Sequence, residues 1–240
     1  MLTVFAADPS YEPLAEPGGK EANEHILRVF KRANIPVVLI DCDIVVPPNR
    51  SGLDIVGIDN FCAGRLVGAH LLERGVRNVV FLAQANYPAT IRQRQEGLRS
   101  VAPCFGGSRM LELRELSVSS LVRAFRRLDG LDAIVCQNDV AAINLMAALR
   151  QLGRRVPEDV LVAGFDDVAY APLLNPSLTT VRQPCRQIAN RAFDLLLERI
   201  GKADVPAEDV RLMPTLVVRG STARCRTKKV VRTSHRSDDE

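Results

Sequence analysis

The sequence predicts an α/β protein whose sheets are largely parallel, and two observations support this fold class. Short apolar runs without in-and-out alternation recur along the chain, which is typical of parallel strands covered on both faces. Segments with apolar residues at helical spacing lie between these runs, so the elements alternate as β-α-β-α. Parallel strands joined by helices imply right-handed crossovers, with helices flanking each sheet.

Five apolar runs are the strand candidates. Each is four to six residues long, rich in Val, Ile, Leu or Ala, and followed by a polar residue. The runs are 35–40, 55–58, 79–83, 132–136 and 160–165.

Three segments between or after these runs are predicted amphipathic helices with readable ends. Apolar residues recur at helical spacing within 63–71, 139–152 and 184–200. A glycine follows each segment and can end the helix in the left-handed conformation: Gly75, Gly153 and Gly201.

Polar clusters follow four of the strand candidates, at the carboxyl end where parallel sheets bind ligands. Any one of these residues can instead be the N-cap of the following helix, so single positions do not discriminate between the two roles. The clusters are Asp41 with Asp43, Asp59 with Asn60, Gln137-Asn138-Asp139, and Asp166-Asp167.

The charge distribution disfavours nucleic-acid binding by most of the chain. The 32 Lys and Arg exceed the 28 Asp and Glu by four. Residues 219–240 hold seven basic and three acidic residues, which leaves 25 of each sign before residue 219. A phosphate-binding face would show as clustered excess basic charge in a folded module, so this neutral body is not expected to bind DNA.

Membrane and metal sites also lack sequence support. No apolar run approaches the roughly 18 residues of a membrane helix, and residues 1–8 lack the features of a signal peptide, so we expect a cytoplasmic protein without a membrane partner. The six cysteines and three histidines are widely spaced, with no C-x-x-C and no H-E-x-x-H, which predicts no metal site.

Catalysis is not expected either. The chain has neither of the glycine-rich phosphate loops G-x-G-x-x-G and G-x-x-x-x-G-K-S/T, so no nucleotide cofactor is predicted. Asp166 and Asp167 are adjacent carboxylates, but neighbouring residues usually point apart and no partner nucleophile is evident. We therefore predict a protein that is not an enzyme and needs no cofactor.

Several motifs together resemble the lactose-repressor and galactose-repressor (LacI/GalR) family of bacterial transcriptional regulators. They occur in the order of that family, and the resemblance extends from about residue 34 to 221. The motifs are 56–60 (VGIDN), 137–142 (QNDVAA), 153–160 (GRRVPEDV), 164–167 (GFDD), 178–184 (LTTVRQP) and 216–221 (LVVRGS).

The resemblance implies a periplasmic-binding-protein-like fold, with two lobes that each contain a parallel sheet flanked by helices. By analogy the chain crosses between lobes near 59–60, 181–184 and 212–214. The first lobe would comprise 1–59 and 185–212, the second 60–181 and 214–221, and 222–240 would be a disordered basic tail. No helix-turn-helix is readable before residue 34, and 1–7 looks like a strand from the middle of a lobe, so the first lobe is expected to be N-terminally truncated.

The family pattern also implies ligand-binding residues. Arg94 matches an R-x-x-G segment whose arginine reaches the cleft, although Arg92 is the alternative if the register differs by two. Asp166 matches an acidic position that accepts hydrogen bonds from vicinal hydroxyls, and the Asn138 amide can both donate and accept. The remaining expected ligand residues are Asp41, Asp59 and Gln183.

The function implied is sensing of a small polar effector, a sugar above all, by a homodimeric regulator. Ligand in the cleft would favour lobe closure and so change the DNA affinity of a module outside this chain. The alternative is a sugar-binding receptor of a transport system, which has the same architecture. Neither effector identity nor the choice between induction and co-repression follows from the residues.

Overall fold

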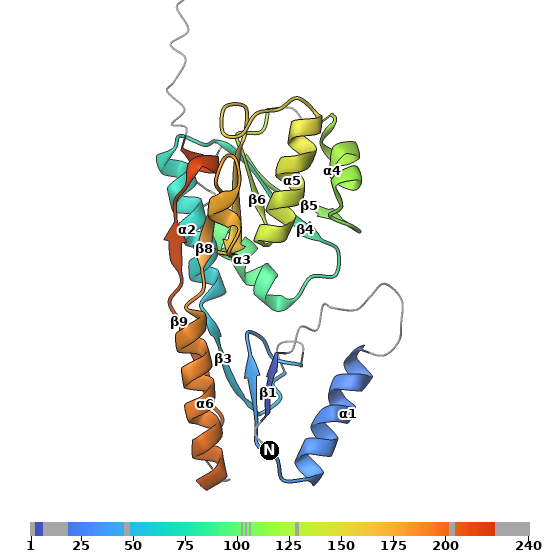
Figure 1. The fold of residues 1–240 in the computed structure, drawn as a ribbon, viewed down its shortest axis with the longest axis vertical. Coiled ribbons are helices and arrows are strands. Elements are labelled where there is room, and N and C mark those ends of the chain that lie inside the picture. Colours follow the sequence, from blue (N-terminus) through green and yellow to red (C-terminus); the bar gives the residue numbers. More distant parts are fainter. Residues whose placement is uncertain are drawn as a thin grey trace, which may run out of the picture.

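The computed structural model describes residues 3–6, 19–45, 49–101, 103, 105, 107–127, 130–201 and 205–223. Two sheets organise them, one above the other (Figure 1). The first sheet is entirely parallel, with strand order β1-β2-β3-β9. Its strands are β1 (Thr3–Ala6), β2 (Val37–Ile40), β3 (Asp54–Ile58) and β9 (Asp209–Leu212).

The second sheet has the strand order β10-β8-β7-β6-β4-β5. Every neighbouring pair is parallel except β10 and β8, which are antiparallel. The strands are β4 (Asn78–Gln84), β5 (Gly107–Leu113), β6 (Ala133–Cys136), β7 (Leu161–Asp166), β8 (Thr179–Arg182) and β10 (Thr215–Val217).

The antiparallel β10 differs from the expected all-parallel sheet, and the connection explains the difference. Strand β9 ends at Leu212 and β10 begins at Thr215, so only two residues separate a strand of the first sheet from one of the second. The parallel strands of each sheet direct their carboxyl ends toward the other sheet. A chain that crosses directly from β9 therefore enters the second sheet at that edge and runs against its neighbours.

Helices cover the two faces of the first sheet because successive side chains of a strand point to opposite faces. Val37 and Leu39 pack with Leu27 and Phe30 of α1 (Gly19–Arg32). On the other face, Val38 and Val56 belong to a core with four residues of α6 (Cys185–Gly201), namely Ile188, Ala192, Leu195 and Leu196. Figure 1 shows α1 and α6 on opposite sides of these strands, and we call this unit the first lobe.

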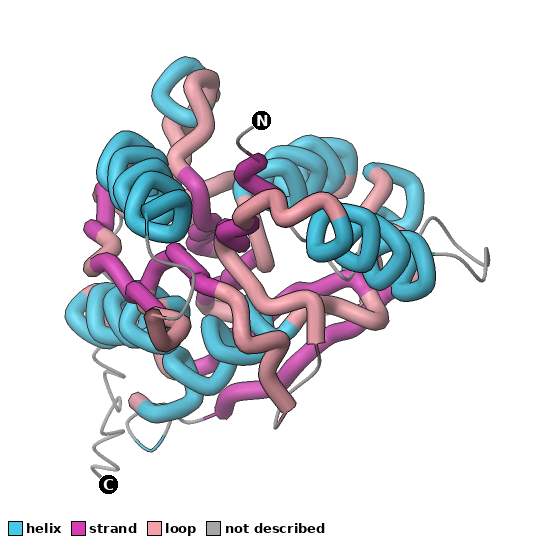
Figure 2. Tube along the Cα trace, turned by 90° about the horizontal axis from the view of Figure 1, so that it is seen from below, coloured by secondary structure: helices cyan, strands magenta, loops and turns pink. Residues whose placement is uncertain are grey.

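The second sheet is covered in the same way, and we call this unit the second lobe. Phe81 and Val135 face α2 (Asn60–Glu73) and α3 (Ala89–Ser100). Leu82 and Ile134, from the same strands, face α4 (Val118–Phe125) and α5 (Asp139–Gln151). Viewed from below, helices lie on both sides of the strands (Figure 2).

Helices α2 and α3 approach each other at backbone distance. A Cβ at Gly64 would lie 1.9 Å from the carbonyl oxygen of Arg94, and a Cβ at Gly97 would lie 2.0 Å from the carbonyl oxygen of Phe61. Only glycine permits this contact, because any side chain would overlap backbone atoms of the opposite helix. The contact fixes the position of α3 relative to the start of α2.

All five predicted strands and the three predicted helices are present. Gly75 and Gly153 follow their helices with φ of +75° and +68°, as expected for left-handed helix ends. The chain passes between the sheets after β3, after β8 and after β9. The residue limits of the lobes stay a prediction. Among the described residues, none of the helices is long and apolar enough to span a membrane.

The segment after β10 corrects the expected start of the tail. Thr222 was placed in a disordered tail, but it lies buried in the short 3-10 helix η3 (Gly220–Thr222). Its hydroxyl is 2.8 Å from Nε2 of His70 and 2.7 Å from the hydroxyl of Thr179. Burial, and then the charge of Arg74, lowers the pKa of His70. The rest of the predicted tail, from residue 224, lies outside the described residues.

Candidate functional site

Arg94, on the inner side of α3, connects three segments of the second lobe. Its Nε donates to the side-chain oxygen of Asn60 at 2.8 Å, and its NH1 donates to the carbonyl oxygen of Gln137 at 2.8 Å. Its NH2 lies 3.6 Å from a carboxylate oxygen of Asp166, and the guanidinium carbon is 4.8 Å from the centre of the Phe165 ring. Arg94 is 3% exposed, so its charge is held by these partners rather than by solvent.

Asp166 ends β7 and is held in an unusual backbone conformation, with φ of +109°. Nε2 of Gln183 donates to its carboxylate at 2.8 Å. Burial raises the pKa of this carboxyl and the charge of Asp41 adds to the rise, whereas Arg94 and Gln183 act in the opposite direction. The predicted residues Arg94, Asp166 and Gln183 therefore lie together, and their roles as ligand contacts stay predictions.

Asp167 is fixed by two arginines rather than offered to a ligand. Its carboxylate accepts from Nε of Arg182 and from NH2 of Arg219, both at 2.6 Å, and its backbone N–H donates to the hydroxyl of Thr180 at 3.2 Å. Burial alone would raise its pKa, but the hydrogen bonds and charges of Arg219 and Arg182 outweigh burial and lower it. These bonds hold the Asp167 backbone at a φ of +52°, a value that residues other than glycine rarely adopt.

Asp139 is the buried carboxylate beneath this turn. It accepts from the hydroxyl of Thr180 at 2.6 Å and from the backbone N–H of Val168 at 3.0 Å. It fits only because residue 164 is glycine, since a Cβ there would lie 2.3 Å from its carboxylate oxygen. Burial raises the pKa of Asp139 to about 6, although both hydrogen bonds oppose the rise.

Two other predicted ligand residues act as helix caps. Asp59 accepts from the backbone N–H of Cys62 at 2.7 Å at the start of α2. Asn138 accepts from the backbone N–H of Ala141 at 2.9 Å at the start of α5. Each residue therefore uses one side-chain oxygen as a helix cap, which is the alternative role that the sequence analysis left open. Their roles as ligand contacts stay predictions.

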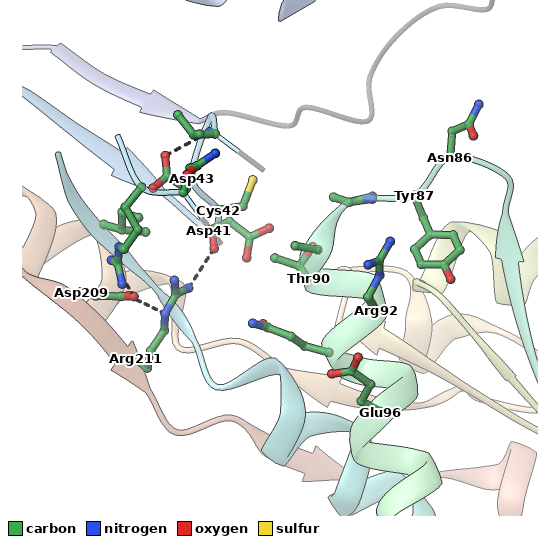
Figure 3. A pocket seen from close by; sticks show the side chains of 17 residues that line it. Asp41, Cys42, Asp43, Asn86, Tyr87, Thr90, Arg92, Glu96, Asp209 and Arg211 are labelled. Carbon is green, nitrogen blue, oxygen red and sulfur yellow. Dashed lines mark hydrogen bonds and ion pairs between the residues drawn. The ribbon is translucent and has the colours of Figure 1, made fainter. Parts of the chain in front are cut away.

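A cavity of about 580 Å³ lies between the lobes, beside the Arg94 cluster rather than over it. Of the six predicted ligand residues, Asp41 is the one among its lining residues. Figure 3 shows the first-lobe residues on one side and the segment that includes the start of α3 on the other. The labelled lining residues are Asp41, Cys42, Asp43, Asn86, Tyr87, Thr90, Arg92, Glu96, Asp209 and Arg211.

Three charged residues of the first-lobe wall, Arg50, Asp209 and Arg211, pair with one another. Asp209 accepts from Nε of Arg211 at 2.6 Å and from NH2 of Arg50 at 2.8 Å. NH1 of Arg211 also donates to the carbonyl oxygen of Asp41 at 3.0 Å. The second-lobe wall presents two exposed charged side chains from one helix, Arg92 and Glu96.

Sequence reasoning missed several of these residues. Asn60 and Gln137 follow strands, so their position gave a signal, but their shared partner Arg94 is far away in the chain. Asp209 and Arg211 lie on an edge strand that no apolar run indicated, and they reach the cavity only because β9 pairs with β3. Within the described residues, no group of three or more His, Cys, Asp or Glu is arranged to hold a metal ion.

Comparisons with known proteins agree with this architecture. A family model described as periplasmic binding protein-like domain matches residues 69–222. A relative, the HTH-type transcriptional repressor PurR of Mannheimia succiniciproducens, is 30% identical over 209 residues, which are 84% of this chain and 61% of that protein. The chain therefore spans about three-fifths of that relative's length.

Solved structures with ligands are also similar. A LacI family transcriptional regulator from Enterococcus faecalis with bound ribose has a TM-score of 0.74 and 27% identity, covering 93% of this chain and 78% of that one. The transcriptional regulator CelR in complex with cellobiose has a TM-score of 0.69 and 27% identity, covering 82% and 62%. The chain thus belongs to the periplasmic binding protein-like family, and it is similar to LacI-family transcriptional regulators over the part of their length that it spans.

Proposed function

We propose that this chain senses a small polar effector, a sugar in the simplest case, for a bacterial transcriptional regulator. The observation that carries the proposal is the 580 Å³ cavity, which residues of both lobes line. A volume of this size lies within the range of small-molecule sites, about 300–1,000 Å³. The two similar regulators named above contain ribose and cellobiose, which supports a sugar as the ligand class.

The chemistry of the cleft suits a ligand rich in hydroxyl groups. Asp41 belongs to the first lobe and Asp166 to the second, yet the charge of Asp41 raises the pKa of Asp166, so the two carboxylates interact across the cleft. Two like charges oppose closer approach of the lobes. Hydroxyl groups that donate to both carboxylates would offset this repulsion, and Asn138, Asp59 and Gln183 are proposed as further polar contacts of the ligand.

Lobe closure is the proposed signal. The chain passes between the sheets three times, and each passage is short enough to act as a hinge. A ligand that contacts both lobes binds the closed arrangement more tightly and shifts the population toward it. In the complete regulator, this change in lobe orientation would alter the DNA affinity of an attached module, so the protein would act in the cytoplasm.

We also propose that the chain forms a homodimer. The exposed large apolar side chains of the second lobe include Val140, Tyr170 and Leu173, the last with 81% of its surface accessible. Contiguous exposed apolar surface is typical of association surfaces, and these side chains are proposed to contribute to one. Sedimentation of the purified chain at micromolar concentration tests this part, and a monomer at all concentrations would contradict it.

Titration calorimetry with ribose, cellobiose and glucose tests the sugar proposal. Asp41→Asn and Asp166→Asn keep an oxygen acceptor but remove the charge, and each is expected to weaken binding by about tenfold or more. Asp159→Asn is the matched control, because its carboxylate pairs with Arg155 on the surface. Binding of none of these sugars, or unchanged affinity in both cleft variants, would contradict the proposal.

A further inference from the structure

Two consecutive residues at the end of β7 have a positive φ, +109° for Asp166 and +52° for Asp167. Residues other than glycine rarely adopt such values, which persist only where the surrounding contacts enforce them. Strained residues of this kind cluster at ligand-binding sites. The contacts that hold this turn therefore affect the position of the Asp166 carboxylate, which we propose as a ligand contact.

The turn is in contact with both segments that follow or precede a passage between the lobes at this end of the sheet. Arg182 is the last residue of β8, directly before the passage to α6, and Arg219 follows β10, the strand that the passage from β9 enters. Both donate to the Asp167 carboxylate at 2.6 Å. Gln183, in the passage after β8, donates to the Asp166 carboxylate at 2.8 Å. The two adjacent carboxylates thus connect the end of β7 with two of the passages.

Arg219 is the better shielded partner of Asp167. Its side chain is 14% exposed and that of Asp167 is 9% exposed, whereas Arg182 is 57% exposed, so solvent screens the Arg182 pair far more. NH1 of Arg219 also donates to the carbonyl oxygen of Leu178 at 2.8 Å, which fixes the guanidinium independently of Asp167. A guanidinium held in this way fixes the Asp167 carboxylate and, with it, the backbone of the turn.

The backbone N–H groups after Asp166 are tied to the elements beneath the turn. The N–H of Asp167 donates to the hydroxyl of Thr180 at 3.2 Å, and that hydroxyl donates to the Asp139 carboxylate at 2.6 Å. The N–H of Val168 donates to the other carboxylate oxygen of Asp139 at 3.0 Å. Thr180 belongs to β8 and Asp139 to α5, so the direction of the Asp166 side chain depends on how the whole turn is held.

We infer that Asp167 is a positioning residue of the effector site: its ion pairs with two arginines hold the strained turn in the form that directs the Asp166 carboxylate toward Arg94. Asp166 and Arg94 keep their predicted roles as ligand contacts. The inference rests on the proposed function for its ligand part. Because Arg182 and Arg219 border two passages between the lobes, the same ion pairs connect the orientation of the lobes with the position of Asp166.

Three variants test the positioning role. Arg219→Gln removes the shielded partner of Asp167, and Arg219→Lys keeps the charge as a conservative rescue. Arg199→Gln is the matched control, because it breaks a similarly buried pair with Asp54 at the amino end of β3, the end that points away from the cleft. Both Gln variants are expected to melt about 6 °C or more below the wild type, since each leaves a buried charge unpaired.

Affinity separates positioning from general stability. Calorimetry with ribose, cellobiose and glucose is run well below every melting temperature. Arg219→Gln is expected to bind about tenfold or more weakly than the wild type, because the strained turn relaxes and Asp166 leaves its place. Arg219→Lys is expected to recover part of this loss, and Arg199→Gln is expected to bind as the wild type does.

A second readout needs no ligand. In ¹⁵N-labelled protein, the side-chain amide signals of Gln183 are assigned by their disappearance in Gln183→Glu. Because this amide donates to Asp166, its signals are expected to differ in chemical shift from those of a solvated glutamine. They are expected to move toward the solvated values in Arg219→Gln and to stay in place in Arg199→Gln.

The outcomes distinguish this inference from the proposed function. If none of the sugars binds the wild type, the sugar proposal is wrong, and the positioning role is judged by the Gln183 signals. Unchanged Gln183 signals in Arg219→Gln overturn the inference in every case. If a sugar binds, equal losses of affinity in Arg219→Gln and Arg199→Gln also overturn it. If Arg219→Gln does not fold, Arg182→Gln removes the exposed partner and takes its place in both readouts, with the same outcomes.

Discussion

Replacement of Gly97 by Ala tests whether the contact between α2 and α3 determines the geometry of the cleft. The new Cβ would lie 2.0 Å from the carbonyl oxygen of Phe61, and relief to the ordinary 3.4 Å requires the helices to separate by about 1.4 Å. No rotamer change can achieve this, because the atom in contact belongs to the backbone. The separation would pull Arg94 away from Asn60, which it contacts at 2.8 Å.

Two opposing effects set the size of the change. Helix propensity alone predicts that Gly→Ala stabilises the protein by about 1 kcal/mol. Overpacking costs about 1–3 kcal/mol, and a rigid backbone contact places Gly97→Ala near the upper value. The expected result is a net loss of about 2 kcal/mol in the free energy of unfolding, which corresponds to a melting temperature about 4–8 °C lower.

The assay is thermal and urea unfolding of Gly97→Ala beside the control Gly68→Ala. A Cβ at Gly68 would lie 2.4 Å from a methyl carbon of Val101, a side chain that can rotate away, so this variant is expected to stay within about 1 kcal/mol of the wild type. A Gly97→Ala protein that melts at or above the wild-type temperature would refute the reasoning, since propensity would then outweigh the contact.

Three further predictions concern buried charges. Asp139 has a pKa of about 6 in the folded protein against 3.8 as its ordinary value, so its contribution to stability is lost as pH rises between these values. Relative to Asp139→Asn, the wild type is expected to lose about 2 kcal/mol of unfolding free energy between pH 4 and 7, and parallel pH curves in urea titrations would contradict this. His70 has the opposite sign: its pKa is lowered on folding, so its contribution is present above the ordinary value of 6.5 and is lost as pH falls below it. The wild type should therefore lose stability relative to His70→Gln from pH 7 to 5, and an unchanged difference would refute the assignment. Arg199 donates from Nε and NH2 to both carboxylate oxygens of Asp54, which is 2% exposed. Arg199→Ala is expected to cost about 3–5 kcal/mol in urea unfolding, and a loss below about 1 kcal/mol would show that Asp54 finds another partner.

Local sequence features predicted much of the fold because they act within a few residues. The five apolar runs form strands, and the glycines after two helices adopt the expected positive φ. Capping also follows from local sequence, as Asp59 and Asn138 show. Strand β9 was missed because it lies at a sheet edge, where its residues alternate between exposed and half-buried and leave only Val210 and Leu212 as an apolar signal.

The candidate site depended more on long-range packing. The family pattern pointed to Arg94, Asp166 and Gln183, and the structure places these residues together. The family pattern could not show that Asn60 and Gln137 complete the contacts of Arg94, because those partners lie 34 and 43 residues away along the chain. It also left out Asp209 and Arg211, whose strand joins the first sheet only through pairing with β3.

By itself, the sequence determined the alternation of strands and helices and the family to which the chain belongs. Only the tertiary structure decided that Arg94 of α3 is buried in the second lobe, whereas Arg92 of the same helix lines the cavity. That choice depends on the rotation of α3 about its own axis, and this rotation is set by backbone contact of Gly64 and Gly97 across the two helices. No local pattern carries this information, since it arises when two helices that form independently pack against each other.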